Sequence, residues 1–522
     1  MLPNKIAMRW VDLVLVFVYV VASAWVGLRF ARRQTSTEAY FVARRSVPSW
    51  AIGMSMMATL VSSVTFIAYP GSAYGSNWAN LVPGFMLLAV LVVAARVLIP
   101  FYREAVRMTA YEYFGHRFGT PTRIYSSIAF SLSHFGKMGF VYYLVALTAN
   151  SVTGWNIDAI ILTIGLVTVL YTVLGGIEAV VWTDVVQGFV MWLGILLALG
   201  FLLLLPPGGP VAVFEVAAAH GKFSLGELSW DFSRATIPVL LLYGFFWYLQ
   251  KYAADQTLVQ RYLLARSDRG AVRGIAIGAL QTVPVWALFM LIGTCTWSFY
   301  KLTGIALPAH IRKADQVFPY FLATQLPPGA AGIFLAALMA AAMSTLASDL
   351  NCISMVGVED VYRRLRPQAT DAMRLRMGKI LVAVFGGLGM LMAEILAHGT
   401  GSALALWFNA SAILSAGLAG LFLLAFLSSR VNARGIYTGI AACVLVTAWA
   451  TLTSGNERWL DLKGFNYPWH ELTIGATGHV VLAVTGYLAS LLFGGKRDDS
   501  AVTLWSWWRA RRASRQRVAA PV

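Results

Sequence analysis

Charged residues are scarce in this chain. Only 12% of its 522 residues are Asp, Glu, Lys or Arg, whereas 58% are hydrophobic and the mean hydropathy is +0.68. This composition excludes a protein made of several soluble domains. Apolar runs of eighteen or more residues recur from end to end, so we predict an all-α polytopic membrane protein. A transmembrane barrel would instead show weak alternation of apolar and polar residues.

Cysteine is rare as well, and each of Cys295, Cys352 and Cys443 lies inside an apolar span. The sequence therefore predicts no disulfide framework and no metal cluster. It has no glycine-rich phosphate loop, and pairs such as Asp184 with Asp349 come without a recognisable enzyme motif. We expect a protein that is not an enzyme and that needs no cofactor.

Acidic residues are few, 23 against 40 basic ones, which gives a formal charge of +17. The basic residues lie beside the apolar spans, so they report membrane orientation rather than binding to nucleic acid. With the N-terminus placed outside, 28 of the 40 fall in segments that become cytoplasmic and 9 in outer segments. We expect an inner-membrane protein of the bacterial type with its N-terminus outside and its C-terminus in the cytoplasm.

At about 20 residues per crossing, the apolar runs predict about 13 transmembrane helices. The first run ends in RFARR rather than at a small-residue cleavage site, so we interpret it as a retained span. Residues 1–495 form the predicted membrane domain, and 496–522 form a basic, Trp-rich cytoplasmic tail that is expected to lie on anionic lipid. The expected spans are 11–28, 47–74, 80–101, 124–152, 157–174, 179–205, 237–259, 274–300, 329–362, 380–397, 403–427, 436–452 and 475–493.

Two spans contain polar interruptions. The second has Ser62, Ser63 and Thr65 followed by Pro70, and the seventh has the polar run 250–257. Backbone can open inside a membrane only where protein or a water-filled cavity satisfies it, so these interruptions predict binding cavities. If 47–205 and 237–427 are inverted five-helix repeats, each interruption lies in the first helix of its repeat.

The ninth span carries a stripe of small and hydroxyl residues. Ala341, Ser344, Thr345 and Ser348 recur at helical spacing, which places them on one narrow face. Such a stripe can hold helices together, or it can supply oxygen ligands to a hard cation beside opened backbone carbonyls. The stripe alone leaves both interpretations open.

Four segments in order resemble the sodium:solute symporter family. They are ARRSVPSWAIGMSMMATLVSSVTFIAYPG from 43, VLGGIEAVVWTDVVQG from 173, DQTLVQRYLLARS from 255 and AAAMSTLASDLN from 340. The resemblance implies a leucine-transporter-like fold, a substrate site near the membrane centre, and alternating access driven by a sodium gradient rather than by ATP. It also implies a main sodium site made of the carbonyls of Ala58, Val61 and Ala341 and the hydroxyls of Ser344 and Thr345.

Some members of that family have a second sodium position. The resemblance places it at Asp184, Ser344 and Ser348, but Ala347 stands where a further hydroxyl is expected. Asp184 then remains as a structural or proton-sensitive carboxylate if no second sodium binds.

The expected substrate is a small organic solute, and Lys137 favours one that carries a carboxylate. Lys137 lies inside the fourth span, where the sialic-acid branch of the family has an arginine that holds the substrate carboxylate. Pairing of Lys137 with an internal acid such as Asp349 is the alternative. A neutral sugar, a vitamin or pantothenate-like solute, and a membrane sensor or enzyme that reuses the fold are the competing functions, and the oligomeric state is left open. The full set of expected substrate-binding residues is Ser62, Ser63, Thr65, Lys137, Tyr243, Trp247, Gln250 and Asn409.

Overall fold

The computed structural model describes residues 10–309, 311–398, 413–455, 458–494 and 502–519, with the backbone alone beyond residue 513. Within these ranges the chain is a bundle of helices with one isolated bridge between Val47 and Ala265. The helices are α1 (Trp10–Arg29), α2 (Thr37–Val42), α3 (Ser49–Leu60), α4 (Ser63–Gly75), α5 (Val82–Val93), α6 (Ile99–Ala105), α7 (Tyr111–Phe118), α8 (Thr120–Thr153), α9 (Ile157–Leu204), α10 (Gly209–Ala219), α11 (Ile237–Ala254), α12 (Gln256–Leu264), α13 (Asp268–Thr303), α14 (Val317–Gln325), α15 (Ala330–Val356), α16 (Arg363–Leu365), α17 (Asp371–His398), α19 (Leu418–Leu427), α20 (Ala433–Thr453), α21 (Ile474–Leu492) and α22 (Leu504–Ala519).

Among the described residues, eight helices are long and apolar enough to cross a membrane, or nine when the bent pair α3 and α4 counts as one span. The predicted number of 13 is larger, and it stays a prediction. One cause of the difference is α9, which runs for 48 residues through both of the expected spans 157–174 and 179–205. The chain turns inside α9 at Gly176, whose φ of +57° favours glycine.

Two helices are broken where the polar interruptions occur. The axes of α3 and α4 differ by 60°, and Val61 and Ser62 between them are extended. The break between α11 and α12 falls at Asp255, whose carboxylate accepts a hydrogen bond from the Thr257 N–H and caps α12. The structure therefore confirms both interruptions, while the repeat boundaries 47–205 and 237–427 stay a prediction.

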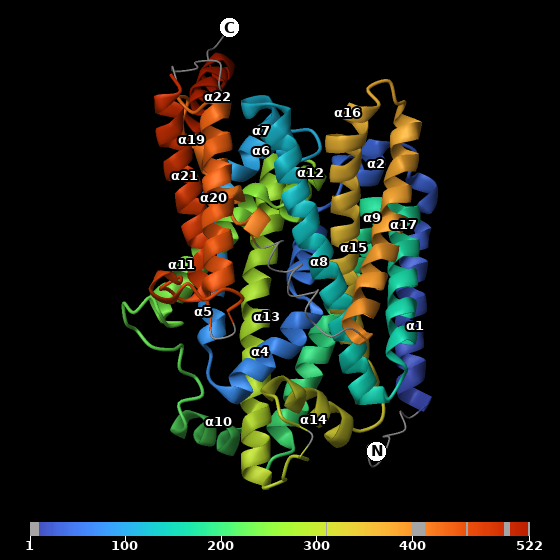
Figure 1. Cartoon of the computed structure of the whole chain (residues 1–522). Coiled ribbons are helices and arrows are strands. Elements are labelled where there is room, and N and C mark those ends of the chain that lie inside the picture. Colours follow the sequence, from blue (N-terminus) through green and yellow to red (C-terminus); the bar gives the residue numbers. More distant parts are fainter. Residues whose placement is uncertain (1–9, 310, 399–412, 456–457, 495–501, 520–522) are drawn as a thin grey trace.

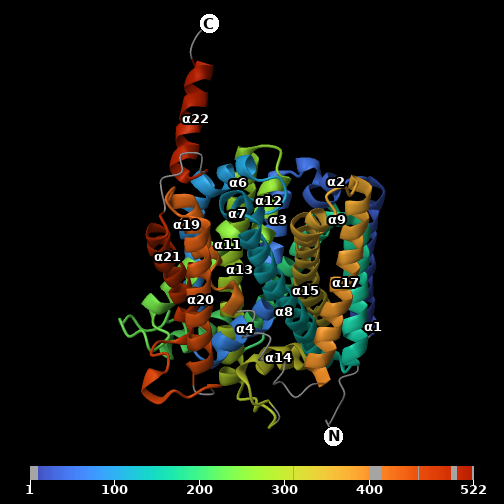
Figure 2. The same ribbon diagram turned by 45° about the horizontal axis from the view of Figure 1, so that its top comes forward.

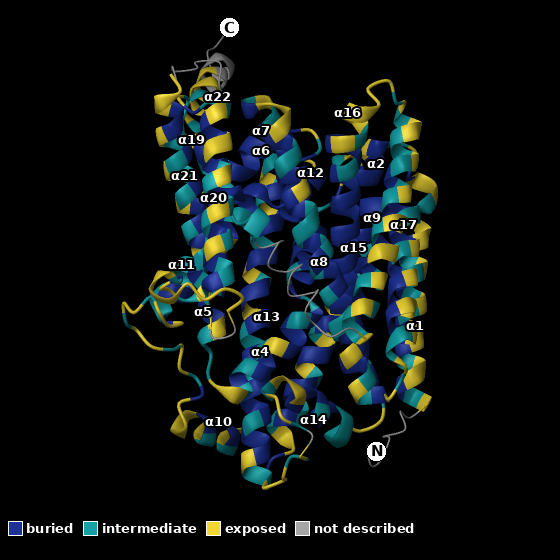
Figure 3. Cartoon of the chain, in the orientation of Figure 1, coloured by how far each residue is buried: buried dark blue, intermediate teal, exposed yellow. Residues whose placement is uncertain are grey.

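The ninth predicted span forms the centre of the bundle. About nine-tenths of the residues in the apolar part of α15 are buried. The helix packs against α9, α8, α3 and α1. Alanines at 337, 340, 341 and 342 let these neighbours approach closely. Figure 3 shows the buried interior around α15 and the exposed residues along α1, α17 and α20, whose apolar surfaces would face lipid.

The start of α1 and the helix α22 lie at opposite ends of the bundle (Figure 1). The C-terminal helix α22 is seen end-on in Figure 1 and lengthwise in Figure 2, so it runs across the bundle axis. Trp507 is buried against Phe101 and donates to Glu104, whereas Trp505 and Trp508 are exposed. This arrangement agrees with a tail that lies along a membrane surface.

Candidate functional site

The break between α3 and α4 leaves backbone carbonyls free at the end of α3, because the chain beyond it offers no helical N–H groups to them. Ser344 Oγ on α15 donates to the Ala58 carbonyl at 2.8 Å and lies 3.1 Å from the Ala341 carbonyl. Thr345 Oγ1 donates to the Ala341 carbonyl at 3.0 Å. The structure thus brings together four of the five residues expected to hold sodium.

The fifth residue, Val61, lies at the break itself and is fully buried. Its N–H donates to the Met57 carbonyl at 2.9 Å and closes the last turn of α3. The cluster consists of carbonyl and hydroxyl oxygens without a full charge, and all of its residues are at most 1% exposed. Neutral oxygen ligands in a buried setting suit a hard monovalent cation, so these residues fit the expected sodium ion.

A second buried cluster surrounds Asp184 on α9, and a cation of the chain itself lies in it. Arg261 Nη2 lies 3.3 Å from Asp184 Oδ2, 2.8 Å from Ser348 Oγ and 3.0 Å from Ser55 Oγ. Ser55 Oγ donates to the same Asp184 oxygen at 2.5 Å. Asp184 and Ser348 therefore meet through Arg261, while the Ser344 hydroxyl is directed to the main cluster instead.

The other Asp184 oxygen, Oδ1, has no hydrogen-bond partner in the described part of the chain, and neither does Arg261 Nε. A buried carboxylate oxygen without a partner is costly. Oδ1 is thus the atom through which this cluster could still hold a water molecule or an ion.

Five ionisable residues form a connected network around His134. His134 on α8 bridges two carboxylates, with Nδ1 at 2.7 Å from Asp349 Oδ1 and Nε2 at 3.1 Å from Asp255 Oδ2. Lys137 Nζ lies 2.9 Å from Asp349 Oδ1, and Lys251 Nζ lies 2.5 Å from Asp255 Oδ2. Each buried carboxylate is thereby paired with an ammonium group, which offsets the cost of burying it.

For Lys137, the arrangement in the structure is the pairing with Asp349 that the sequence analysis left as an alternative. The Lys137 side chain is nevertheless 35% exposed, whereas Asp349 is fully buried. An ammonium group has three N–H donors, and Lys137 Nζ donates one of them to Asp349 Oδ1 at 2.9 Å. Asp349 Oδ2 lies 2.8 Å from Nζ but accepts no hydrogen bond in the described part of the chain. The other N–H donors of Lys137 are thus left for an acceptor on the open side.

Five of the other seven expected substrate residues have local partners. Ser62 and Thr65 form the capping box that starts α4, and Ser63 Oγ lies 3.4 Å from the Val141 carbonyl. On α11 the rings of Tyr243 and Trp247 lie 5.7 Å apart. Gln250, on the same helix, is half-buried, and Asn409 lies outside the described residues.

The sequence analysis missed Arg261, Ser55 and Thr59 as site residues. Arg261 stands in the segment DQTLVQRYLLARS, just beyond the end of the expected span 237–259, so the sequence did not suggest it as a partner for Asp184. A usable signal was present, since an acid inside an apolar span needs a partner of opposite charge. Ser55 and Thr59 lie three residues before and one residue after Ala58, and both bond the Arg261 guanidinium.

A cleft of about 1020 Å³ opens elsewhere, between α1, α9 and the start of α3. Arg29, Arg33 and Arg266 line it together with Trp25 and Trp182. None of the expected site residues lines this cleft, so we do not assign it to the transported solute.

Comparison with known proteins agrees with this geometry. The model of the sodium:solute symporter family matches residues 40–442. The sodium/sialic acid symporter NanT of Aliivibrio fischeri is 31% identical over 95% of this chain and 96% of its own length. The sodium-dependent multivitamin transporter of Oryctolagus cuniculus is also 31% identical, over 85% of this chain and 70% of its own.

The fold has a solved relative. The substrate-bound, outward-open structure of a Na⁺-coupled sialic acid symporter has a TM-score of 0.86 and 29% identity, and the match covers 94% of this chain and 99% of that one. The predicted all-α, leucine-transporter-like fold is thereby confirmed. By its sequence match, its broken helices and the oxygen cluster between them, this chain belongs to the sodium:solute symporter family.

Proposed function

We propose that this protein is a sodium-coupled symporter that imports a small, carboxylate-bearing organic solute by alternating access. The observation that carries the proposal is the buried oxygen cluster at the α3/α4 break, where Ser344 and Thr345 of α15 meet the carbonyls of Ala58 and Ala341. Sodium bound there would join a broken helix to the central helix, so ion binding and helix arrangement would be linked.

The charge and exposure of Lys137 support the proposal that the solute carries a carboxylate. Its side chain is partly exposed, and its ammonium group keeps N–H donors beyond the one that bonds Asp349 Oδ1. NanT, which shares 31% identity, is named for sialic acid, a sugar acid. Because the multivitamin transporter is as similar by identity, overall likeness leaves the solute open, and the charge at Lys137 is the more specific argument.

The proposed stoichiometry is one sodium ion per solute. Arg261 already supplies a positive charge to Asp184, and it bonds Ser348 as well. A second sodium ion at Asp184 would have to bind next to the Arg261 guanidinium. Because both carry a positive charge, the ion and the guanidinium would repel each other. Asp184 then acts as the structural partner of Arg261.

The network around His134 serves, in this proposal, as the inner gate. It joins α8, α15 and the α11/α12 break in the half of the bundle that is expected to face the cytoplasm. These ion pairs hold the inner path closed, and solute release requires that they separate.

Uptake into proteoliposomes tests the function. The purified protein is supplied in turn with sialic acids, short monocarboxylates, pantothenate-like acids and neutral sugars, with and without an inward sodium gradient. We expect uptake of a carboxylated solute that requires sodium, with one ²²Na⁺ entering per solute. Uptake that is unchanged in sodium-free buffer would contradict sodium coupling.

The carboxylate is tested in the same vesicles. We expect the wild type to transport the carboxylated solute in preference to its amide, and Lys137→Ala to lose that preference. Lys137→Arg keeps the charge and serves as the matched control, which should retain the preference. Equal discrimination by wild type and Lys137→Ala would remove Lys137 from the solute site.

A further inference from the structure

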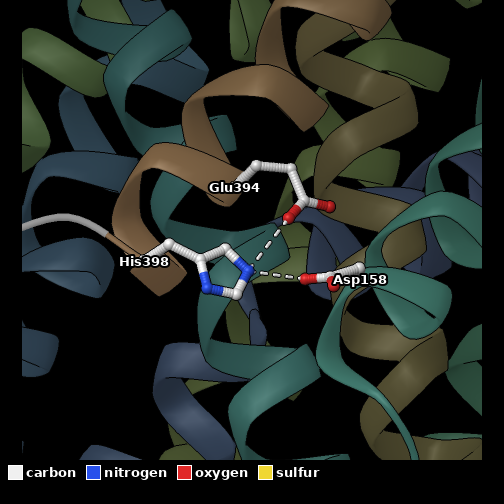
Figure 4. Close-up of side chains that lie close together, drawn as sticks. All are labelled: Asp158, Glu394 and His398. Carbon is white, nitrogen blue, oxygen red and sulfur yellow. Dashed lines mark hydrogen bonds and ion pairs between the residues drawn. The ribbon is translucent and has the colours of Figure 1, made fainter.

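Three potential metal ligands meet at the end of the bundle where α1 begins. Asp158 lies in the first turn of α9, and Glu394 and His398 lie one turn apart at the end of α17 (Figure 4). His398 Nε2 is 2.7 Å from Asp158 Oδ1 and 3.6 Å from Glu394 Oε2. One ligand atom from each of the three residues lies within 4.8 Å of the others.

The group differs from an ordinary surface ion pair in its charge. It holds two carboxylates and one imidazole, and in the part of the chain that the structure describes no Lys or Arg forms an ion pair with Asp158 or Glu394. Other exposed acids have such partners, as Glu227 has Arg234 and Asp461 has Arg458. The cluster therefore carries an excess of negative charge that a cation can neutralise.

The donor atoms match one class of cation. One imidazole nitrogen with carboxylate oxygens is a ligand set that zinc and similar divalent transition metals accept, at metal to ligand distances of about 2.0 to 2.2 Å. Ligand atoms around a tetrahedral zinc of that size are roughly 3.4 Å apart. The 3.6 Å pair is close to this spacing, and the 2.7 Å pair opens when the metal replaces the hydrogen between the two atoms.

The helices hold the ligands in place. Glu394 and His398 are four residues apart on one helix, so they project from the same face. In the structure α17 packs against α9, with the Met390 side chain directly over Gly165, and this contact fixes Asp158 relative to the other two residues. The His398 side chain is 64% exposed, so an ion can enter from solvent and water can fill the fourth position.

We propose that Asp158, Glu394 and His398 form a binding site for one divalent transition metal ion of the zinc class, which joins the start of α9 to the end of α17. The bound ion takes one ligand from α9 and two from α17. Binding displaces the hydrogen from His398 Nε2, and the neutral imidazole that binds the ion carries its hydrogen on Nδ1. The site is independent of the sodium cluster and of the solute.

Isothermal titration of the purified, EDTA-stripped full-length protein with Zn²⁺ tests the proposal. We expect one Zn²⁺ per chain. His398→Ala and Glu394→Gln should weaken Zn²⁺ binding by about 10- to 100-fold. Loss of a residue that only hydrogen-bonds a metal ligand typically costs this much affinity, and loss of a ligand itself should cost at least as much. A Co²⁺ absorption spectrum that His398→Ala abolishes provides a second readout.

His220→Ala is the matched control. His220 is also an exposed histidine, but its Nδ1 bonds the Val216 carbonyl, and among the described residues it belongs to no group of metal ligands. This variant should bind Zn²⁺ as the wild type does. The proposal is overturned if wild type binds no Zn²⁺ at about 1 mM, an affinity of only about 4 kcal/mol, or if His398→Ala binds as tightly as wild type. Glu394→Gln preserves side-chain size and so keeps the test valid if His398→Ala fails to fold.

Discussion

Ser344 and Thr345 have two roles in the same place. Each hydroxyl donates to a backbone carbonyl, and each carries lone pairs that a cation can use. Without the ion they satisfy the carbonyls at the broken end of α3, and with it their oxygens and these carbonyls can become ligands together. Removing the two hydroxyls therefore changes both the affinity for sodium and the local helix packing. A test has to distinguish these two effects.

The double variant Ser344→Ala and Thr345→Ala should raise the sodium concentration for half-maximal uptake by about tenfold or more. Loss of the two oxygen ligands together is expected to cost on the order of 1.4 kcal/mol or more, and 1.4 kcal/mol is about tenfold in affinity. The measurement is solute uptake in proteoliposomes over a range of sodium concentrations.

Ser354→Ala is the control for that variant. Ser354 is a buried serine of the same helix, and its hydroxyl donates to the Gly378 carbonyl on α17, away from the sodium cluster. It loses a similar hydrogen bond, but its sodium dependence should match that of the wild type. A shift of equal size in Ser354→Ala would assign the effect to α15 packing instead of to sodium.

Broken helices and close helix contacts set the geometry of the elements. The α3/α4 break supplies the carbonyls, and α13 holds α4 in position by direct backbone contact at Gly293. A Cβ at Gly293 would come within 2.1 Å of the Pro70 carbonyl oxygen. Because this oxygen belongs to the backbone of α4, it could move away only if α4 shifted. By contrast, a Cβ at Gly387 on α17 would meet nothing within 4 Å.

Gly293→Ala should therefore destabilise the protein by about 1 to 3 kcal/mol, because an added methyl group in a packed contact forces such shifts. Thermal unfolding of the detergent-purified protein measures the change as a lower midpoint. Gly387→Ala, the matched control on a spanning helix, should leave the midpoint unchanged or raise it slightly, since alanine is the better helix former. Equal midpoints for the two variants would contradict the proposed α4 contact.

Local sequence features predicted the elements well. Polar residues inside apolar runs located the breaks near Val61 and Asp255, and the spacing of Ser344 and Thr345 located the face that meets the first of them. The sequence could not predict which charged side chains pair with each other across the bundle. Lys137 had two chemically reasonable partners, and Arg261 lies 77 residues from Asp184, so only the packing of α12 against α3 and α15 brings its guanidinium to that acid.

At the scale of the whole molecule, the orientation in the membrane remains a prediction from the distribution of Lys and Arg. Figure 1 shows the α16–α17 connection at the top of the bundle, whereas the α10–α11 connection rises along the left side from α10 near the bottom to the level of α11. Ser233 in the α10–α11 connection and Gln368 in the α16–α17 connection are exposed. The three native cysteines are buried, so they give little background in a labelling experiment.

We expect a membrane-impermeant maleimide to label Ser233→Cys in intact cells and Gln368→Cys only after permeabilisation. The reason is the excess of basic residues on the side of Gln368, which favours the cytoplasm. Labelling is read by a gel shift. The reverse pattern would invert the orientation and would also place the proposed zinc site on the cytoplasmic side.

The position of Arg261 has a consequence for the energy available to transport. Arg261 is part of the chain and stays in the membrane, so its charge is never delivered to the cytoplasm as that of a free ion would be. With one sodium ion and a solute of charge −1, each cycle moves no net charge. The membrane potential, worth about 2.3 kcal/mol per charge at 100 mV, would then add nothing, and accumulation would depend on the sodium concentration gradient alone.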